Sequence, residues 1–89
     1  MTAPARRLSV VLYGRAGCHL CDEAEETLRR IARTIPMTIT LIDIDSDDYL
    51  QNRYMLEIPV IAVDGEEIAS APVSPAELED ALRRLAYSA

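Results

Sequence analysis

Residues 8–21 read LSVVLYGRAGCHLC, a stretch that joins an apolar run to a glycine-containing turn and a pair of cysteines. The run Leu8–Tyr13 is β-branched and apolar with little alternation, which is typical of a strand buried on both faces. Glycines then break the pattern, and a helix is expected to begin at about Cys18. Cys18 and Cys21 are therefore predicted to lie where a buried strand passes into a helix.

The helix that follows should have one apolar face and end at Pro36. Residues 37–43, MTITLID, begin with clean alternation of apolar and polar residues and predict a second strand. A strand, a long helix and another strand form a βαβ unit, whose two strands are parallel. The apolar residues of the helix recur at steps of three and four, as an amphipathic helix requires: Leu20, Ala24, Leu28, Ile31 and Ile35.

A short helix and a hairpin are predicted next. Residues 45–48 look like a helix start, and the helix would bury Leu50 and Tyr54. Asp64-Gly65 is a strong signal for a two-residue hairpin turn. The strands that this turn joins are predicted at residues 59–63 and 66–69.

A last helix completes the pattern. Ser74 and Glu77 form a capping box, with Pro75 at the first helical position. The resulting order βαβαββα predicts an α/β fold with a four-stranded mixed sheet flanked by helices. The apolar face of this last helix would be Leu78, Ala81, Leu82 and Leu85.

Length and composition favour one globular domain. The chain has 89 residues, a length that suits one domain. We expect residues 8–89 to form this domain and residues 1–7 to be a flexible lead-in. The absence of an apolar run of about 18 residues argues against a membrane span, and the apolar run after the basic start is too short for a signal peptide. We therefore expect a cytoplasmic protein. The net charge of −6 argues against nucleic acid or an anionic membrane as partner.

The cysteine pair is the main candidate for chemistry. A bridge between residues three apart closes a very small loop and adds little stability, so a redox role explains it better than a structural one. The N–H groups at a helix start favour a thiolate on Cys18, and Cys21 lies one turn away, where it could resolve a mixed disulfide. Arg15 and His19 could add positive potential. Two acidic residues act in the opposite direction, Asp22 and Glu23.

Other interpretations of these residues stay open. A free cysteine is often simply a small buried hydrophobic residue. A zinc site needs about four ligands, whereas this segment offers only Cys18, Cys21 and His19, so no metal site is predicted. His19 is better explained as a solvent-facing residue with a mild electrostatic role.

Residues 10–21 resemble the active-site segment of glutaredoxins, within the thioredoxin-like superfamily. The resemblance extends to residues 57–60, Glu-Ile-Pro-Val, to the Asp-Gly turn and to the final helix, and it is closest to the short bacterial glutaredoxin-like proteins. It covers nearly the whole chain past residue 7. In that family the first cysteine attacks and the second resolves, which implies these roles for Cys18 and Cys21.

The resemblance implies roles for four further residues near the pair. The family proline that matches Pro59 is cis and faces the cysteines, and the residue before it, here Ile58, offers backbone hydrogen bonds to a bound peptide or glutathione. Arg15 matches a basic position that contacts a glutathione carboxylate, and Tyr13 matches an aromatic residue near the site. Two alternatives stay open: Pro59 could merely begin a strand, and Tyr13 could merely pack in the core.

Two departures from the family pattern bear on glutathione recognition. Glutaredoxins usually carry a glycine pair before the last helix, whereas residues 70–75 here read SAPVSP. Ser74 could still offer a helix N-terminus to a carboxylate, but Pro75 removes one of the N–H donors there. The simpler role of Ser74 is that of a helix cap. His19 stands where the family usually has proline.

These observations predict a thiol–disulfide oxidoreductase that works by dithiol exchange on protein or glutathione disulfides. No tightly bound cofactor is expected; glutathione is a candidate co-substrate, a reductase a candidate partner, and a monomer the expected state. Two alternatives remain. The first is a module in which two chains bridge a metal or an iron–sulfur cluster, and the second is a non-enzymatic interaction domain with the same fold.

Overall fold

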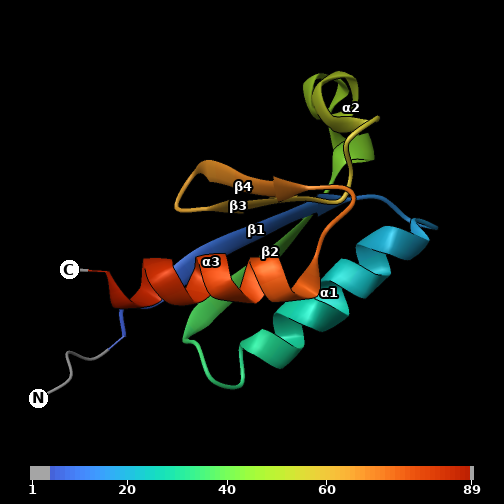
Figure 1. Ribbon diagram of the computed structural model, residues 1–89. Coiled ribbons are helices and arrows are strands. Elements are labelled where there is room, and N and C mark those ends of the chain that lie inside the picture. Colours follow the sequence, from blue (N-terminus) through green and yellow to red (C-terminus); the bar gives the residue numbers. More distant parts are fainter. Residues whose placement is uncertain (1–4, 89) are drawn as a thin grey trace, which may run out of the picture.

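A computed structural model describes residues 5–88 and contains one four-stranded sheet in the order β2-β1-β3-β4 (Figure 1). The predicted order βαβαββα is confirmed, with one added turn of 3-10 helix, η1. Among the helices of residues 5–88, none has both the length and the apolar character needed to cross a bilayer. The elements are β1 (Leu8–Gly14), α1 (His19–Ile31), β2 (Met37–Asp43), η1 (Ile44–Ser46), α2 (Asp48–Tyr54), β3 (Val60–Val63), β4 (Glu66–Ser70) and α3 (Pro75–Tyr87).

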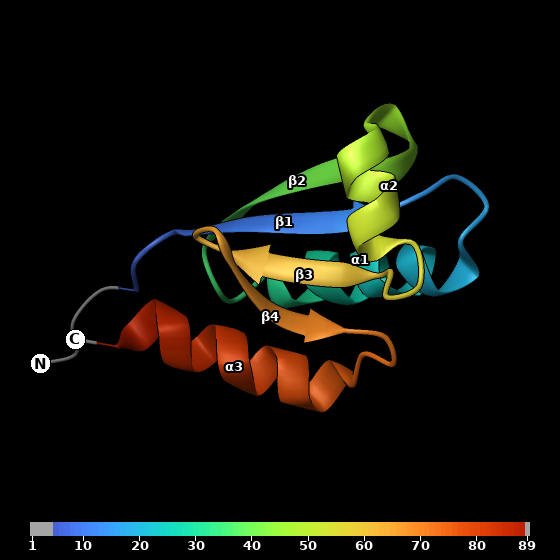
Figure 2. The ribbon, with the colours of Figure 1, turned by 90° about the horizontal axis from the view of Figure 1, so that it is seen from above.

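Strand β1 is central in the sheet. It pairs in parallel with β2, from Leu8 opposite Met37 to Gly14 opposite Asp43, which confirms the βαβ unit. It also pairs antiparallel with β3 on its other side. Helices α1 and α3 cover one face of the sheet, whereas α2 lies over the other face at the carboxyl end of β1 (Figures 1 and 2).

The burial of β1 follows from this layering. Leu8, Val10 and Leu12 point to the face under α1 and α3 and are at most 4% exposed. Val11 and Tyr13 point to the other face and are only partly buried, because the short helix α2 covers just one end of it. The prediction that this strand is buried on both faces is therefore correct for one face and wrong for the other.

Helix α1 differs from its prediction at both ends. Leu20 is 54% exposed instead of buried, since Cys21, Ala24 and residues further along the helix form the buried side and Leu20 lies at its edge. The helix ends at Ile31 and not at Pro36. The chain continues in turns, from which Ile35 still reaches the core and is fully buried.

The β3–β4 hairpin turns at Asp64 and Gly65, whose φ angles are +51° and +88°. Positive φ at both central residues is what the tightest hairpin turns require, and Asp and Gly tolerate it. The Asp64 carboxylate also accepts hydrogen bonds from Ser9 N at 3.2 Å and Arg6 Nη1 at 2.6 Å. This carboxylate therefore ties the hairpin to the start of β1.

The chain before β1 is held in place where the structure describes it. Arg6 N donates to Ala86 O at 2.9 Å, and Arg7 Nε donates to Thr38 Oγ1 at 3.0 Å. Residues 6 and 7 thus make contacts with the domain, and the flexible lead-in stays a prediction; residues 1–4 lie outside the described residues. These contacts link the start of the chain to α3 and β2.

Capping residues set the starts of the two later helices. Asp47 caps α2 by accepting from Tyr49 N and Leu50 N, so α2 begins at Asp48, after η1. Leu50 is half-buried and Tyr54 is 9% exposed, as the predicted apolar side of this helix requires. Ser74 caps α3. The buried residues of α3 are Leu78 and Leu82, which the sequence predicted, and Ala86.

Gly14 lets α1 approach β1 closely. A Cβ atom at Gly14 would lie 3.0 Å from Cys21 Sγ and 3.1 Å from Cys21 Cβ, both shorter than ordinary contacts. We expect Gly14→Ala to lower the free energy of unfolding by about 1–3 kcal/mol, the usual effect of overpacking. Urea denaturation of the oxidised protein measures it. Ser9→Ala, at an exposed position of the same strand, is the control, and equal stability of the two variants would contradict the close packing.

Asp64 should make stability depend on pH. The hydrogen bond from Arg6, followed by that from Ser9 N, lowers the pKa of Asp64. A lowered folded-state pKa means that the contribution is present above the unfolded value of about 3.9 and is lost as pH falls through the folded value. We expect Asp64→Asn to flatten the acid limb of the unfolding midpoint measured against pH. Glu66→Gln on the same hairpin is the control, and an unchanged limb in Asp64→Asn would refute this account.

Candidate active site

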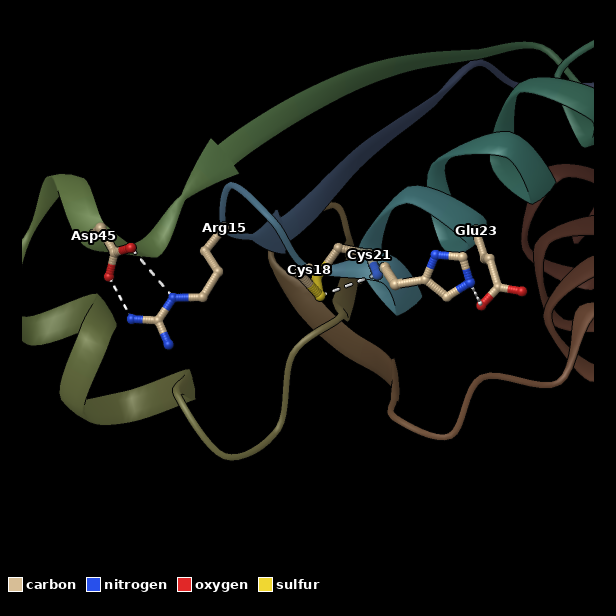
Figure 3. Close-up of a disulfide and its surroundings, with 6 residues drawn as sticks. Arg15, Cys18, Cys21, Glu23 and Asp45 are labelled. Carbon is tan, nitrogen blue, oxygen red and sulfur yellow. Dashed lines mark hydrogen bonds and ion pairs between the residues drawn. A yellow bond between two sulfur atoms is a disulfide. The ribbon is translucent and has the colours of Figure 1, made fainter.

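Cys18 and Cys21 form a disulfide at the start of α1, with their Cα atoms 5.2 Å apart (Figure 3). Cys18 is the N-cap residue, in extended conformation with φ −87° and ψ 103°. Gly17 precedes it with φ +79°, a left-handed conformation that glycine adopts without strain. Cys18 N donates to Arg15 O at 3.3 Å, which closes the turn between β1 and α1. The predicted strand–turn–helix placement of the pair is confirmed.

The two sulfur atoms differ in their surroundings. Cys18 Sγ accepts a hydrogen bond from Cys21 N at 3.1 Å, so this N–H of the first helical turn points at the sulfur. Such a donor, together with the dipole of the helix start, stabilises a thiolate. Cys18 is partly exposed, whereas Cys21 is only 6% exposed and packs on Gly14. An incoming sulfur therefore meets Cys18 first.

Arg15 turns away from the cysteines and pairs with Asp45 in η1 (Figure 3). Its guanidinium makes two hydrogen bonds to that carboxylate, at 2.6 Å and 3.2 Å. The pair raises the pKa of Arg15 and lowers the pKa of Asp45, chiefly through these hydrogen bonds. Arg15 is thus engaged by a carboxylate 30 residues further along the chain, and its expected contribution of positive potential at Cys18 stays a prediction.

The side chain of His19 is exposed to solvent, as the sequence predicted. Its side chain is 86% exposed, and Nε2 is 3.6 Å from Glu23 Oε2 one turn along the helix. Within residues 5–88, no three His, Cys, Asp or Glu side chains come together as ligands for a metal ion. The zinc interpretation therefore finds no set of ligands in the described part of the chain.

Tyr13 and Ile58 belong to a small apolar cluster beneath α2. The Tyr13 ring stacks on the Tyr54 ring with centroids 4.6 Å apart and planes 24° apart. Burial raises the pKa of Tyr54. Tyr13 therefore has a packing role, and its expected place beside a substrate stays a prediction. Ile58 N donates to Tyr54 O at 3.1 Å, so this N–H is not free to bind a peptide or glutathione.

The loops around the pair contain two cis peptide bonds, Ile58–Pro59 and Ala71–Pro72. Pro59 is fully buried and precedes β3. Ser74 lies after the second cis bond, and its Oγ accepts from Glu77 N at 3.3 Å. Its role as a helix cap is therefore confirmed, whereas its proposed contact with a carboxylate stays a prediction.

Sequence reasoning missed Asp45 and the contact between Gly14 and Cys21. Residues 45–48 predict a helix start, and nothing local in the sequence signals that Asp45 pairs with Arg15. The contact of Gly14 depends on how closely α1 lies on β1. The only hint in the sequence was a glycine at the end of a buried strand.

Comparison with known proteins agrees with this geometry. A family model described as Glutaredoxin-like domain (DUF836) matches residues 9–83. Target XcR50 from X. campestris, solved by X-ray, is 35% identical, with a TM-score of 0.70 over 83% of this chain and 95% of its own. Protein Ne2328 from Nitrosomonas europaea is 25% identical, with a TM-score of 0.76 over 91% of this chain and 98% of its own.

The fold is also that of more distant proteins. The oxidised thioredoxin from Plasmodium falciparum has a TM-score of 0.65 at 15% identity, over 89% of this chain and 81% of its own. This likeness confirms the thioredoxin-like fold. Since the family model spans most of the chain and the cysteine pair lies at the expected strand–helix junction, the chain belongs to the glutaredoxin-like domain family.

Proposed function

We propose that this protein is a thiol–disulfide oxidoreductase that works by dithiol exchange through Cys18 and Cys21. One observation carries the proposal: Cys18 Sγ accepts the Cys21 N–H at the start of α1 and is the more accessible sulfur of the pair. A thiolate is the nucleophile in disulfide exchange, and helix starts lower cysteine pKa values below the usual value of about 8.5. The reduced form of the pair would thus have its attacking and resolving cysteines distinguished by position.

The reaction has two displacements. The Cys18 thiolate attacks one sulfur of a substrate disulfide, and its S–S bond breaks as the bond to Cys18 Sγ forms. The first substrate thiolate leaves with the electron pair and takes a proton from water. The Cys21 thiol loses its proton to solvent, and the resulting thiolate attacks Cys18 Sγ, closes the intramolecular disulfide and expels the second substrate thiolate, which is protonated by water. The substrate gains two electrons, and the cysteine pair is oxidised.

The proposed substrates are protein disulfides or glutathione mixed disulfides. We propose that the protein itself is monomeric and cytoplasmic. Either two glutathione thiols or a reductase would return the pair to the dithiol. Two features bear on the choice: Arg15 is already paired with Asp45, and Ser74 caps a helix. A glutathione carboxylate would have to compete with Asp45 for Arg15. Extended peptide disulfides, which depend less on such a contact, are therefore the favoured substrates.

Cysteine variants test the mechanism. We expect Cys18→Ser to reduce disulfide turnover to the uncatalysed background, because the attacking sulfur is gone. Cys21→Ser, the matched control with the same chemical change, should keep the first displacement and accumulate a mixed disulfide on Cys18. Turnover is measured with a peptide disulfide, with glutathione and a reductase supplied separately, and mass spectrometry detects the trapped adduct.

Two outcomes would contradict the proposal. Full turnover by Cys18→Ser would show that this sulfur is not the nucleophile. A Cys21→Ser protein that forms no adduct with the peptide disulfide would show that Cys18 does not attack. Circular dichroism of both variants establishes that they are folded before either result is interpreted.

A further inference from the structure

The loop between α2 and β3, residues 55–59, lies at the same end of the sheet as the cysteine pair. The antiparallel register of β1 and β3, continued by one residue, places Pro59 opposite Gly14. Gly14 is the residue against which Cys21 Sγ packs. In Figure 3 the same loop rises from α2 to meet the sheet next to the cysteines. The loop therefore forms part of the surface around the accessible sulfur of Cys18.

Arg53, in the last turn of α2, connects this loop to the sheet through its guanidinium. Its Nη1 donates to Glu57 Oε2 at 2.8 Å, and its Nη2 donates to both carboxylate oxygens of Glu67, at 2.9 Å and 3.3 Å. Glu57 belongs to the loop, and Glu67 belongs to β4, an edge strand of the sheet. One side chain therefore bridges a helix, the loop that follows it and a strand.

Backbone hydrogen bonds extend this bridge to a second loop. Glu57 N donates to Tyr54 O at 2.8 Å, and Glu57 O accepts from Ala71 N at 3.2 Å. Ala71 lies between β4 and α3, in the other loop at this end of the sheet. The position of Glu57 therefore determines how the two loops lie against each other.

Polar contacts, not burial, hold the first half of the α2–β3 loop. Leu56 is 92% exposed and Met55 is 45% exposed, so neither side chain anchors the loop in the core. The charge of Glu67 is the largest cause of the raised pKa of Arg53, and Glu57 adds a smaller contribution. A single exposed ion pair adds little stability, but an arginine shared by two carboxylates holds both of them in fixed positions.

We propose that Arg53 is a positioning residue for polypeptide substrates. By holding Glu57 and Glu67 together, it keeps the loop beside the cysteines in the form in which a polypeptide disulfide binds. The inference rests on the proposed dithiol exchange. A loop that is ordered beforehand costs no further ordering when the substrate binds. Loss of the bridge should therefore weaken binding and leave the attack by Cys18 unchanged.

Two probes with the same reacting bond separate binding from chemistry. In the first, the cysteine of a short uncharged peptide is joined to a coloured aromatic thiol; in the second, 2-mercaptoethanol is joined to the same thiol. The Cys18 thiolate attacks the aliphatic sulfur, the S–S bond breaks, and the aromatic thiolate leaves with the electron pair. Only the peptide is long enough to contact the loop. Stopped-flow absorbance of reduced protein, mixed with increasing probe concentrations, gives the half-saturating concentration and the limiting rate.

Arg53→Met removes the bridge. Methionine keeps an apolar side chain over the Tyr54 ring, whose centroid is 4.8 Å from Arg53 Cζ. We expect the half-saturating concentration of the peptide probe to rise about fivefold, because the loop must then be ordered on binding. The limiting rate with the peptide and the rate constant with the small probe should equal those of the wild type.

Glu57→Gln removes a charge of the opposite sign and weakens the same bridge. We expect it to raise the half-saturating concentration of the peptide probe as well. The double variant should be no worse than Arg53→Met alone, because both changes act through one contact. A direct electrostatic effect on the substrate would instead change the two single variants in opposite directions.

Arg84→Met is the matched control. It removes the same charge from an ion pair with Asp80, and both of these residues lie within α3. Its kinetics should match the wild type with both probes. Thermal melts followed by circular dichroism establish that all variants are folded.

The outcomes distinguish this inference from the proposed exchange. Equal slowing of both probes in Arg53→Met would indicate a change at the reacting sulfur and overturn the inference. An unchanged half-saturating concentration in Arg53→Met, or opposite changes in Arg53→Met and Glu57→Gln, would overturn it too, while the exchange itself would stand. If the reduced wild type releases no coloured thiolate from the small probe, the proposed dithiol exchange fails, and the inference fails with it.

Discussion

The close contact between the end of β1 and the first turn of α1 is the constraint on which the rest of the site depends. Gly14 has no Cβ, and Cys21 takes up the space where one would lie. This packing fixes the first turn of α1 over the sheet, so that Cys18 becomes the N-cap and its sulfur faces the Cys21 N–H. One glycine thereby places both sulfurs, one buried and one accessible.

The charged side chains around the cysteine pair form ion pairs with one another. The cation expected to assist Cys18 is paired with Asp45, and the imidazole of His19 lies in solvent beside Glu23. The helix N-terminus is then the main positive feature that contacts the Cys18 sulfur. A site of this kind relies on a backbone donor that the fold holds in place.

Sequence patterns predicted the elements well because each pattern arises from local geometry. The Asp-Gly turn, the Ser74 cap and the parallel β1–β2 pair follow from backbone preferences and from the length of the crossover helix. Leu20 shows where this reasoning failed. Its spacing fits the apolar stripe, but the buried side of α1 is centred on Cys21, Ala24 and Leu28, which leaves Leu20 at the edge.

The sequence alone was enough to place the cysteine pair at a strand–helix junction, because apolar runs, glycines and helix periodicity act over a few neighbouring residues. The pairing of Arg15 with Asp45, the contact of Gly14 with Cys21 and the pairing of Arg53 with Glu67 could be known only from the folded chain. These contacts join residues that are distant in sequence or lie on different elements. They depend on strand register and on how closely a helix packs on the sheet, quantities that local patterns do not specify.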